Sequence, residues 1–121
     1  MNRRPVVAVV DDDSRLLESL EELLESAGYA VRCFGSSHEL LKEDLSALDL
    51  LITDVGMPDM DGFRLRKEVK RAHPDLPVFM ITGRHEIADQ IRAQGASPLF
   101  PKPLDGPVLL SAIEGALRTR T

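Results

Sequence analysis

The chain has 121 residues, of which 43% are hydrophobic and 29% are charged, and its formal net charge is −5. This length and composition predict one globular domain over residues 1–121, which needs no disulfide to bury a core. The acidic balance argues against direct nucleic-acid contact, and the apolar stretches are too short for a membrane span. From the sequence Met1–Pro5 we expect no signal peptide, and a single cysteine, Cys33, favours a reducing, cytoplasmic location.

The first third of the chain predicts a strand, a helix and a second strand. Val6–Val10 is wholly apolar, as expected of a strand buried on both faces of a sheet. Leucines at helical spacing follow from residue 16 to residue 24, and Gly28 stands where it can end that helix. Tyr29–Phe34 is rich in aromatic and apolar residues and predicts the second strand.

The middle of the chain repeats this alternation. Ser36 and Glu39 have the spacing of a capping box, which predicts a short second helix. Leu48–Thr53 is a third apolar strand, Gly62–Ala72 is a helix that His73-Pro74 ends, and Pro77–Thr82 is a fourth strand.

The last third predicts a short helix, a short strand and a final helix. Ile87–Gln94 is the short helix, Leu99–Phe100 is the fifth strand, and Asp105 caps the last helix. Five strands alternating with five helices indicate a doubly wound α/β fold with a parallel sheet. Ligands of such folds bind at the carboxyl ends of the strands.

Polar side chains follow four of the five predicted strands. In chain order they are Asp11, Asp12 and Asp13, then Asp54, Thr82 and Lys102. Three carboxylates that converge at one edge of a sheet need a cation, because an uncompensated buried charge costs several kcal/mol. Carboxylate, carbonyl and water oxygens suit Mg²⁺, with Mn²⁺ as an alternative. For Asp13 we favour a different role, as the N-cap of the first helix.

Two of these residues are not needed for metal binding. The Lys102 ammonium and the Thr82 hydroxyl are donors suited to phosphate oxygens. A carboxylate beside a divalent cation, a lysine and a hydroxyl is arranged to accept a phosphoryl group as a nucleophile. The residues therefore predict phosphoryl transfer onto Asp54.

Four segments are similar to the response-regulator receiver family, and the resemblance runs from about Val6 to Leu117. The segments are VVDDD (9–13), TDVGMPDMDG (53–62), MITG (80–83) and PKP (101–103). The resemblance implies a flavodoxin-like strand order, 2-1-3-4-5, and a Lys102–Pro103 peptide bond that is cis as a rule. It implies these roles: Asp54 as phosphoacceptor, Asp11, Asp12 and the Gly56 backbone carbonyl as further Mg²⁺ ligands, Thr82 as switch hydroxyl and Lys102 as phosphate partner.

The resemblance also implies how such a domain works. A sensor histidine kinase or a phosphotransfer protein would supply the phosphoryl group, and the domain would catalyse its own phosphorylation without being a conventional enzyme. Phosphorylation would shift the face formed by the fourth helix, the fifth strand and the last helix. That face would control an output domain or partner, or form a homodimer.

One position departs from the family pattern, and another bears on how long the phosphoryl group would last. The family usually carries an aromatic residue three positions before the lysine, where this chain has Leu99. Phe100 follows at once, and one step along a strand points to the opposite face of the sheet. We therefore expect intact Asp54 chemistry with an unusual output face. Arg84, two residues after Thr82, is a candidate for tuning the lifetime of the phosphate.

Two other functions stay open at the level of sequence. One is a receiver-like protein-interaction module that works without phosphorylation, which Leu99 and a short fourth helix favour. The other is a Mg²⁺-dependent phosphatase with an aspartyl-phosphate intermediate. Such enzymes usually place a second acid two residues after the nucleophile, where this chain has Gly56.

Overall fold

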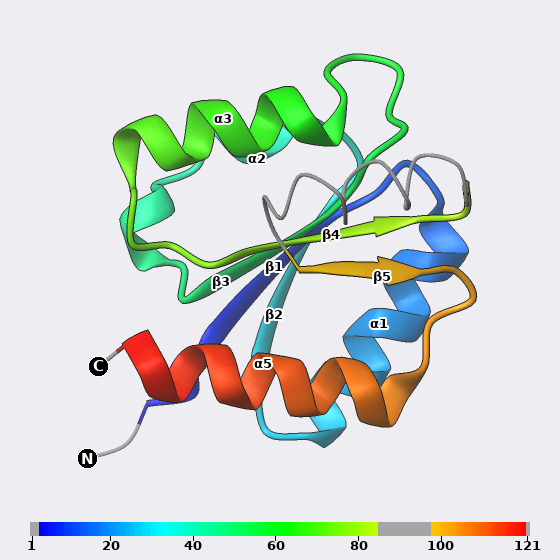
Figure 1. Ribbon diagram of the computed structural model, residues 1–121, viewed down its shortest axis with the longest axis vertical. Helices are drawn as coiled ribbons and strands as arrows, with labels where there is room; N and C mark the ends of the chain where they lie inside the picture. Colours follow the sequence, from blue (N-terminus) through cyan, green and yellow to red (C-terminus); the bar gives the residue numbers. More distant parts are fainter. Residues whose placement is uncertain (1–2, 85–97, 121) are drawn as a thin grey trace.

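A five-stranded parallel sheet organises the computed structural model, which describes residues 3–84 and 98–120 (Figure 1). The strands are β1 (Val6–Val10), β2 (Ala30–Phe34), β3 (Leu50–Asp54), β4 (Val78–Thr82) and β5 (Leu99–Pro101). Their spatial order is β2-β1-β3-β4-β5, and all four neighbouring pairs are parallel. The predicted fold class and strand order are confirmed.

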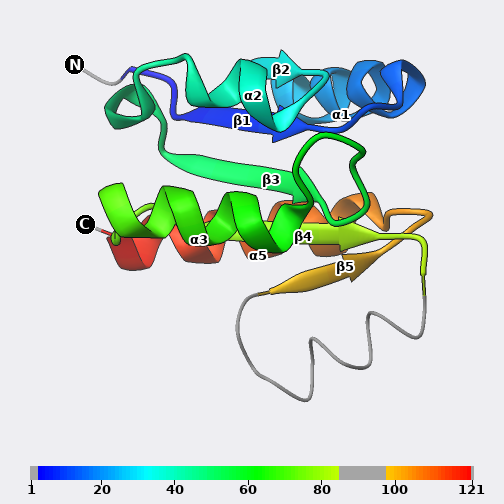
Figure 2. The ribbon, with the colours of Figure 1, turned by 90° about the horizontal axis from the view of Figure 1, so that it is seen from above.

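Helices cover both faces of the sheet. The described helices are α1 (Ser14–Ser26), α2 (Ser37–Leu41), α3 (Gly62–Ala72) and α5 (Gly106–Arg120), with one 3₁₀ turn at Leu45–Ala47. Figures 1 and 2 show α2 and α3 on one face and α1 and α5 on the other. The fourth predicted helix, Ile87–Gln94, lies outside the described residues. Within the described ranges, no helix is long and apolar enough to span a membrane.

The ends of α1 follow the predicted capping chemistry. Asp13 is the N-cap, and its side chain accepts from the backbone N–H groups of Arg15 and Leu16. The helix ends at Ser26 with Ala27 as the C-cap. Gly28 comes next with a φ of 97°, a backbone conformation that residues with a Cβ rarely adopt. The predicted end of the helix is therefore correct to within one residue.

The third strand starts later than the sequence pattern predicts. The apolar run begins at Leu48, but β3 spans Leu50–Asp54. Asp44 caps the preceding 3₁₀ turn, and the N–H of Leu48 donates to the carbonyl of Leu45. Leu48 is still buried in the core, so burial rather than strand conformation explains its apolar side chain. Asp54 belongs to the strand itself as its last residue.

Alternate residues of β1 and β3 enter two different cores. Val10 and Leu51 pack with Leu65 under α3, whereas Val9 and Ile52 pack against helices α1 and α5. Because both faces are covered, the central strands are almost free of solvent and read as continuous apolar runs. This two-sided packing fixes the carboxyl ends of β1, β3, β4 and β5 at one edge of the sheet.

Candidate functional site

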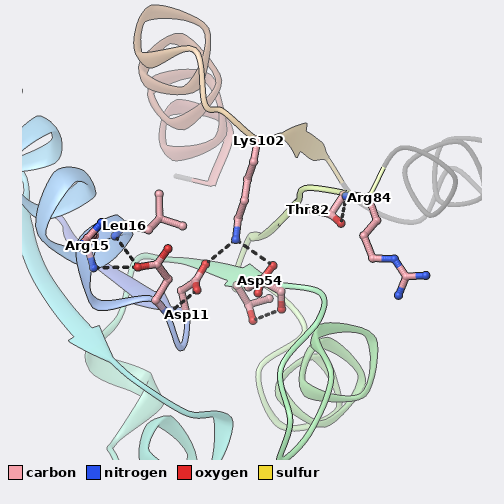
Figure 3. A network of polar contacts seen from close by, with 9 residues as sticks. Asp11, Arg15, Leu16, Asp54, Thr82, Arg84 and Lys102 are labelled. Carbon is pink, nitrogen blue, oxygen red and sulfur yellow. Dashed lines mark hydrogen bonds and ion pairs between the residues drawn. The ribbon is translucent and has the colours of Figure 1, made fainter.

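The carboxyl ends of β1, β3 and β5 bring two acids and a lysine together. The Lys102 ammonium lies 3.0 Å from an Asp11 carboxylate oxygen and 3.4 Å from an Asp54 carboxylate oxygen. Asp11 is fully buried and Asp54 is 7% exposed. Figure 3 shows the lysine side chain reaching from the end of β5 toward both acids. The structure brings these three residues together, as the sequence predicts.

A third carboxylate completes the acidic cluster. Oxygen atoms of Asp11, Asp12 and Asp54 all lie within 4.8 Å of one another, and Asp12 is exposed. Hard carboxylate oxygens are the ligands that Mg²⁺ takes in proteins. The three acids are therefore a donor set that would suit this ion.

Burial and charge oppose each other at this cluster. Removal from water raises the pKa of the Asp11 carboxyl, although the N–H of Asp13 and the Lys102 ammonium oppose that shift. Burial lowers the pKa of Lys102, but the hydrogen bond that its ammonium donates to Asp11 and the charge of Asp54 outweigh this effect, so the net pKa shift is upward. Lys102 is therefore held as an ammonium ion between two carboxylates.

Thr82 ends β4 beside this cluster. The residue is 3% exposed, its carbonyl accepts from the N–H of Lys102 at 2.8 Å, and its hydroxyl oxygen accepts from the N–H of Arg84 at 3.1 Å. The Thr82 hydroxyl keeps its own proton for a further acceptor. The Arg84 side chain extends away from the Lys102–Asp54 pair (Figure 3). The Lys102–Pro103 peptide bond is cis, as the resemblance implies.

Gly56 is the predicted site residue for whose role the structure gives the least support. It is exposed in the loop two residues after Asp54, and a Cβ added there would meet no atom within 4 Å. Its role as a carbonyl ligand stays a prediction.

Gly62 positions the strand end that carries Asp54, a role that the sequence reasoning did not assign. A Cβ on Gly62 would lie 2.4 Å from the carbonyl oxygen of Asp54 and 2.9 Å from the Cα of Val55. The N–H of Gly62 donates to the carbonyl of Val55 at 2.8 Å. The start of α3 therefore rests directly on the backbone of the predicted phosphoacceptor. The Asp61-Gly62 pair directly before the helix is the only signal of this role in the sequence.

A second unpredicted feature ties α2 to the loop between β3 and α3. The Asp59 carboxylate accepts from the backbone N–H of His38 at 3.1 Å and lies 2.7 Å from its ring Nδ1. The buried Ser37 hydroxyl donates to the carbonyl of Met60 at 2.9 Å. These bonds join segments 21 or more residues apart, so no local sequence pattern announces them. They fix the loop that begins directly after Asp54.

The two residues at the departure position lie on opposite faces of the sheet, as their spacing predicts. Leu99 packs against Val55 and Met80, on the side of β4 away from α5. The ring of Phe100 packs instead against Phe79, with centroids 5.2 Å apart, in the core next to α1 and α5. Leu99 is half-buried in this state.

The fold and the cluster define a class: doubly wound α/β proteins with an acidic, lysine-paired pocket at the carboxyl edge of the sheet. Residues 7–114 match the family model for the response regulator receiver domain. The chain belongs to that family, of which phosphorylation and Mg²⁺ are general features and whose receiver domains are generally not conventional enzymes.

Named relatives agree with this membership. The chain is 36% identical over 120 residues to the response regulator protein TodT of Pseudomonas putida, a match covering 97% of this chain and 53% of TodT. It is 37% identical over 118 residues to the DNA-binding transcriptional regulator NtrC of Escherichia coli K12, covering 95% of this chain and 25% of NtrC. The chain thus spans about half and a quarter of these relatives.

A solved structure also matches. The crystal structure of a response regulator receiver domain protein from Clostridium thermocellum aligns with a TM-score of 0.85 and 28% identity, over 96% of each chain. The backbones of the two chains agree over almost their full length, so the chain resembles the family in fold as well as in sequence.

Proposed function

We propose that residues 1–121 form one receiver domain that accepts a phosphoryl group on Asp54. The observation that carries this proposal is the Asp54 carboxylate at the end of β3, 3.4 Å from the Lys102 ammonium and clustered with two further acids. The Asp54 pocket would draw the phosphoryl group from a phosphohistidine of a sensor kinase or phosphotransfer protein, or from a small acyl phosphate.

The residues of the pocket divide the chemistry among them. An Asp54 carboxylate oxygen attacks phosphorus, a P–O bond forms, and the donor's P–N or P–O bond breaks with its electron pair leaving on the donor. Asp11, Asp12, Asp54 and the Gly56 carbonyl would hold Mg²⁺, which neutralises phosphoryl oxygens when bound. The Lys102 ammonium moves from its carboxylate partners toward the new anion, and the Thr82 hydroxyl donates to it.

Signal output would start from Thr82 and the strand that follows. A phosphoryl group adds about −1.5 to −2 charges beside Thr82 and Lys102. Thr82 ends β4, Lys102 directly follows β5, and a backbone hydrogen bond joins them, so movement of one is transmitted to the other. Leu99, at the start of β5, would change its packing where the family usually moves an aromatic ring. Arg84 would tune how long the phosphate lasts.

The partners follow from this role. A sensor histidine kinase or phosphotransfer protein would act as donor, and an output domain or a second copy would read the face that includes α5 and β5. The fourth helix expected on that face lies outside the described residues. TodT and NtrC extend beyond the region that this chain matches, which fits an output domain in a longer protein. A cytoplasmic location fits the free, half-buried thiol of Cys33.

Incubation with acetyl phosphate and Mg²⁺, read by intact mass, tests the proposal. We expect a gain equal to one phosphoryl group in the wild-type protein and none in Asp54→Asn. Asp59→Asn is a matched control because it removes an acid from the same loop and leaves the cluster intact. Absence of the adduct would favour a module that works without phosphorylation, and an adduct in Asp54→Asn would place the reaction on another residue.

A further inference from the structure

Positive charge in this acidic chain is concentrated on α3. The helix holds five of the 15 basic residues and one of the 20 acids of a chain whose net charge is −5. Arg64, Lys67 and Arg71 are exposed and follow one another at helical spacing, so they form a basic stripe on one face of the helix. This face points away from the sheet, because Leu65 and Val69 are buried on the opposite side.

The basic stripe is available to a partner. Within residues 3–84 and 98–120, no side-chain hydrogen bond or ion pair involves Arg64, Lys67 or Arg71. The other two cations of α3, Arg66 and Lys70, do have contacts inside the domain. The stripe is therefore defined by the three exposed side chains alone, whose charges are not used to hold the fold together.

Two neighbours refine what such a partner must look like. Phe63 lies four residues before Lys67 on the same helix face and is 39% exposed. Glu68, the acid of α3, is half-buried, and one carboxylate cannot neutralise three exposed cations. A surface that fits this face should therefore be acidic along the stripe and carry only small side chains where it meets the Phe63 ring.

The same chain presents such a surface on α1. Three acids are exposed there at helical spacing: Glu18, Glu22 and Glu25. Their steps of four and then three residues equal those of the basic stripe when it is read backward, from Arg71 to Arg64. Each set rises by about 10.5 Å along its helix. An antiparallel approach of the two helices therefore places each acid opposite one cation.

The two stripes cannot meet within one copy, because α1 and α3 lie on opposite faces of the sheet (Figures 1 and 2). We propose that the basic stripe of one copy docks antiparallel on α1 of a second copy. The ion pairs are Glu18–Arg71, Glu22–Lys67 and Glu25–Arg64. The Phe63 ring then lies over Ser26 and Ala27, the small exposed residues that follow the last acid.

This contact joins two different surfaces, so it is heterologous and leaves one unused stripe at each end of any assembly. It builds open chains of copies, since a closed dimer would need α1 and α3 on the same side of the sheet. Exposed ion pairs are weak and are screened by salt, so the contact is transient in dilute solution. It uses neither the Asp54 pocket nor the face that includes α5 and β5.

Sedimentation of the full chain over a concentration series at low salt tests the contact. We expect the average mass to rise with concentration without levelling off at the dimer mass. The rise should disappear at about 1 M salt, where the screening length falls to about 3 Å. The double variants Lys67→Glu/Arg71→Glu and Glu18→Lys/Glu22→Lys should each weaken the association roughly tenfold or more, because like charges then face each other.

A variant that combines all four substitutions is the matched control. It keeps the net charge of −5 and exchanges the signs of the two stripes, so it should associate like the wild-type protein. A 1:1 mixture of the two double variants should also associate, because the acidic α1 of one meets the basic α3 of the other. Asp54→Asn should associate normally, whether or not Asp54 is a phosphoacceptor.

Four results would each overturn the proposal. They are a wild-type mass that does not depend on concentration at low salt, a mass that levels off at the dimer, double variants that associate like wild type, and no recovery in either the combined variant or the mixture. Circular dichroism of every variant confirms that its fold is intact, and the mixture keeps the test valid if the combined variant does not fold.

Discussion

Lys102 is a single side chain on which two buried charges depend. Its ammonium is the cation that the structure places within 3.4 Å of both Asp11 and Asp54. Burial already raises the pKa of Asp11, and Lys102 acts against that rise. A carboxylate that loses its cation in such a place either stays charged at a cost or takes up a proton.

Lys102→Ala should therefore destabilise the protein at neutral pH by about 2–3 kcal/mol, less than a fully buried pair because the lysine is 28% exposed. A raised folded pKa means that stability is lost as pH rises through it, and the variant raises the Asp11 pKa further. The deficit should thus shrink as the pH falls from neutral toward the raised pKa of Asp11. Urea unfolding over a pH series measures it, with Lys67→Ala as the exposed control. A deficit that grows in acid would contradict this account.

Gly62 is required because there is no room for a side chain at this position, and not because of its backbone conformation. A methyl group there would meet the Asp54 backbone at 2.4 Å, and backbone cannot move aside as a side chain can. Gly115, inside α5, has no atom within 4 Å of a built Cβ. Replacing glycine by alanine should therefore change the free energy of unfolding in opposite directions at the two sites.

Gly62→Ala should lower the free energy of unfolding by about 1–3 kcal/mol, as overpacking does. Gly115→Ala should raise it by about 0.5–1 kcal/mol, because alanine favours a helix interior over glycine. Chemical denaturation of both variants provides the comparison. Gly62→Ala should also slow phosphorylation by acetyl phosphate, since it displaces Asp54. Equal stability changes in the two variants would show that α3 is free to move away from β3.

At the scale of elements, α2 and the loop after β3 are held together by Asp59. Burial works to raise the pKa of this carboxyl, but the N–H and ring of His38 outweigh it and the net pKa shift is downward. A lowered folded pKa contributes stability above the unfolded value, and this stability is lost as pH falls through the folded pKa.

Asp59→Ala should cost about 1 kcal/mol at neutral pH, the usual net worth of such hydrogen bonds, and the difference from wild type should vanish in acid. His38→Ala should cost less, since the backbone N–H of residue 38 still donates to Asp59. Thermal unfolding across a pH series tests both variants. A cost for Asp59→Ala that persists at a pH well below the unfolded pKa would show that the carboxylate charge is not the cause.

The elements also show which features a sequence can reveal. The bounds of β1, Val6–Val10, were predicted to the residue because a strand buried on both faces is a continuous run of apolar residues. Leu48 misled the prediction because core burial selects apolar residues in turns as well as in strands. The acids and Lys102 could be predicted because parallel strands deliver their ends to one edge. The tether between His38 and Asp59 could not, because it depends on how two distant loops meet.

At the scale of the whole molecule, repulsion among the acids of the pocket lowers the stability of the fold, and a bound cation would relieve it. Three carboxylates within 4.8 Å repel one another, and Lys102 balances only part of that charge. A metal that binds the folded state and not the unfolded chain adds stability by mass action, about 2.7 kcal/mol at a hundred times its dissociation constant. Global stability therefore reports on the site without any phosphorylation.

Mg²⁺ should thus raise the thermal midpoint of the wild-type protein in a concentration-dependent way. Asp12→Asn is the sharpest variant, because Asp12 is the exposed member of the cluster and its loss leaves the Lys102 pairs intact. It should keep the metal-free midpoint near that of wild type and lose most of the Mg²⁺-dependent increase. Asp13→Asn, which keeps a capping oxygen one residue away, should retain that increase. An equal response to Mg²⁺ in wild type and Asp12→Asn would remove Asp12 from the metal site.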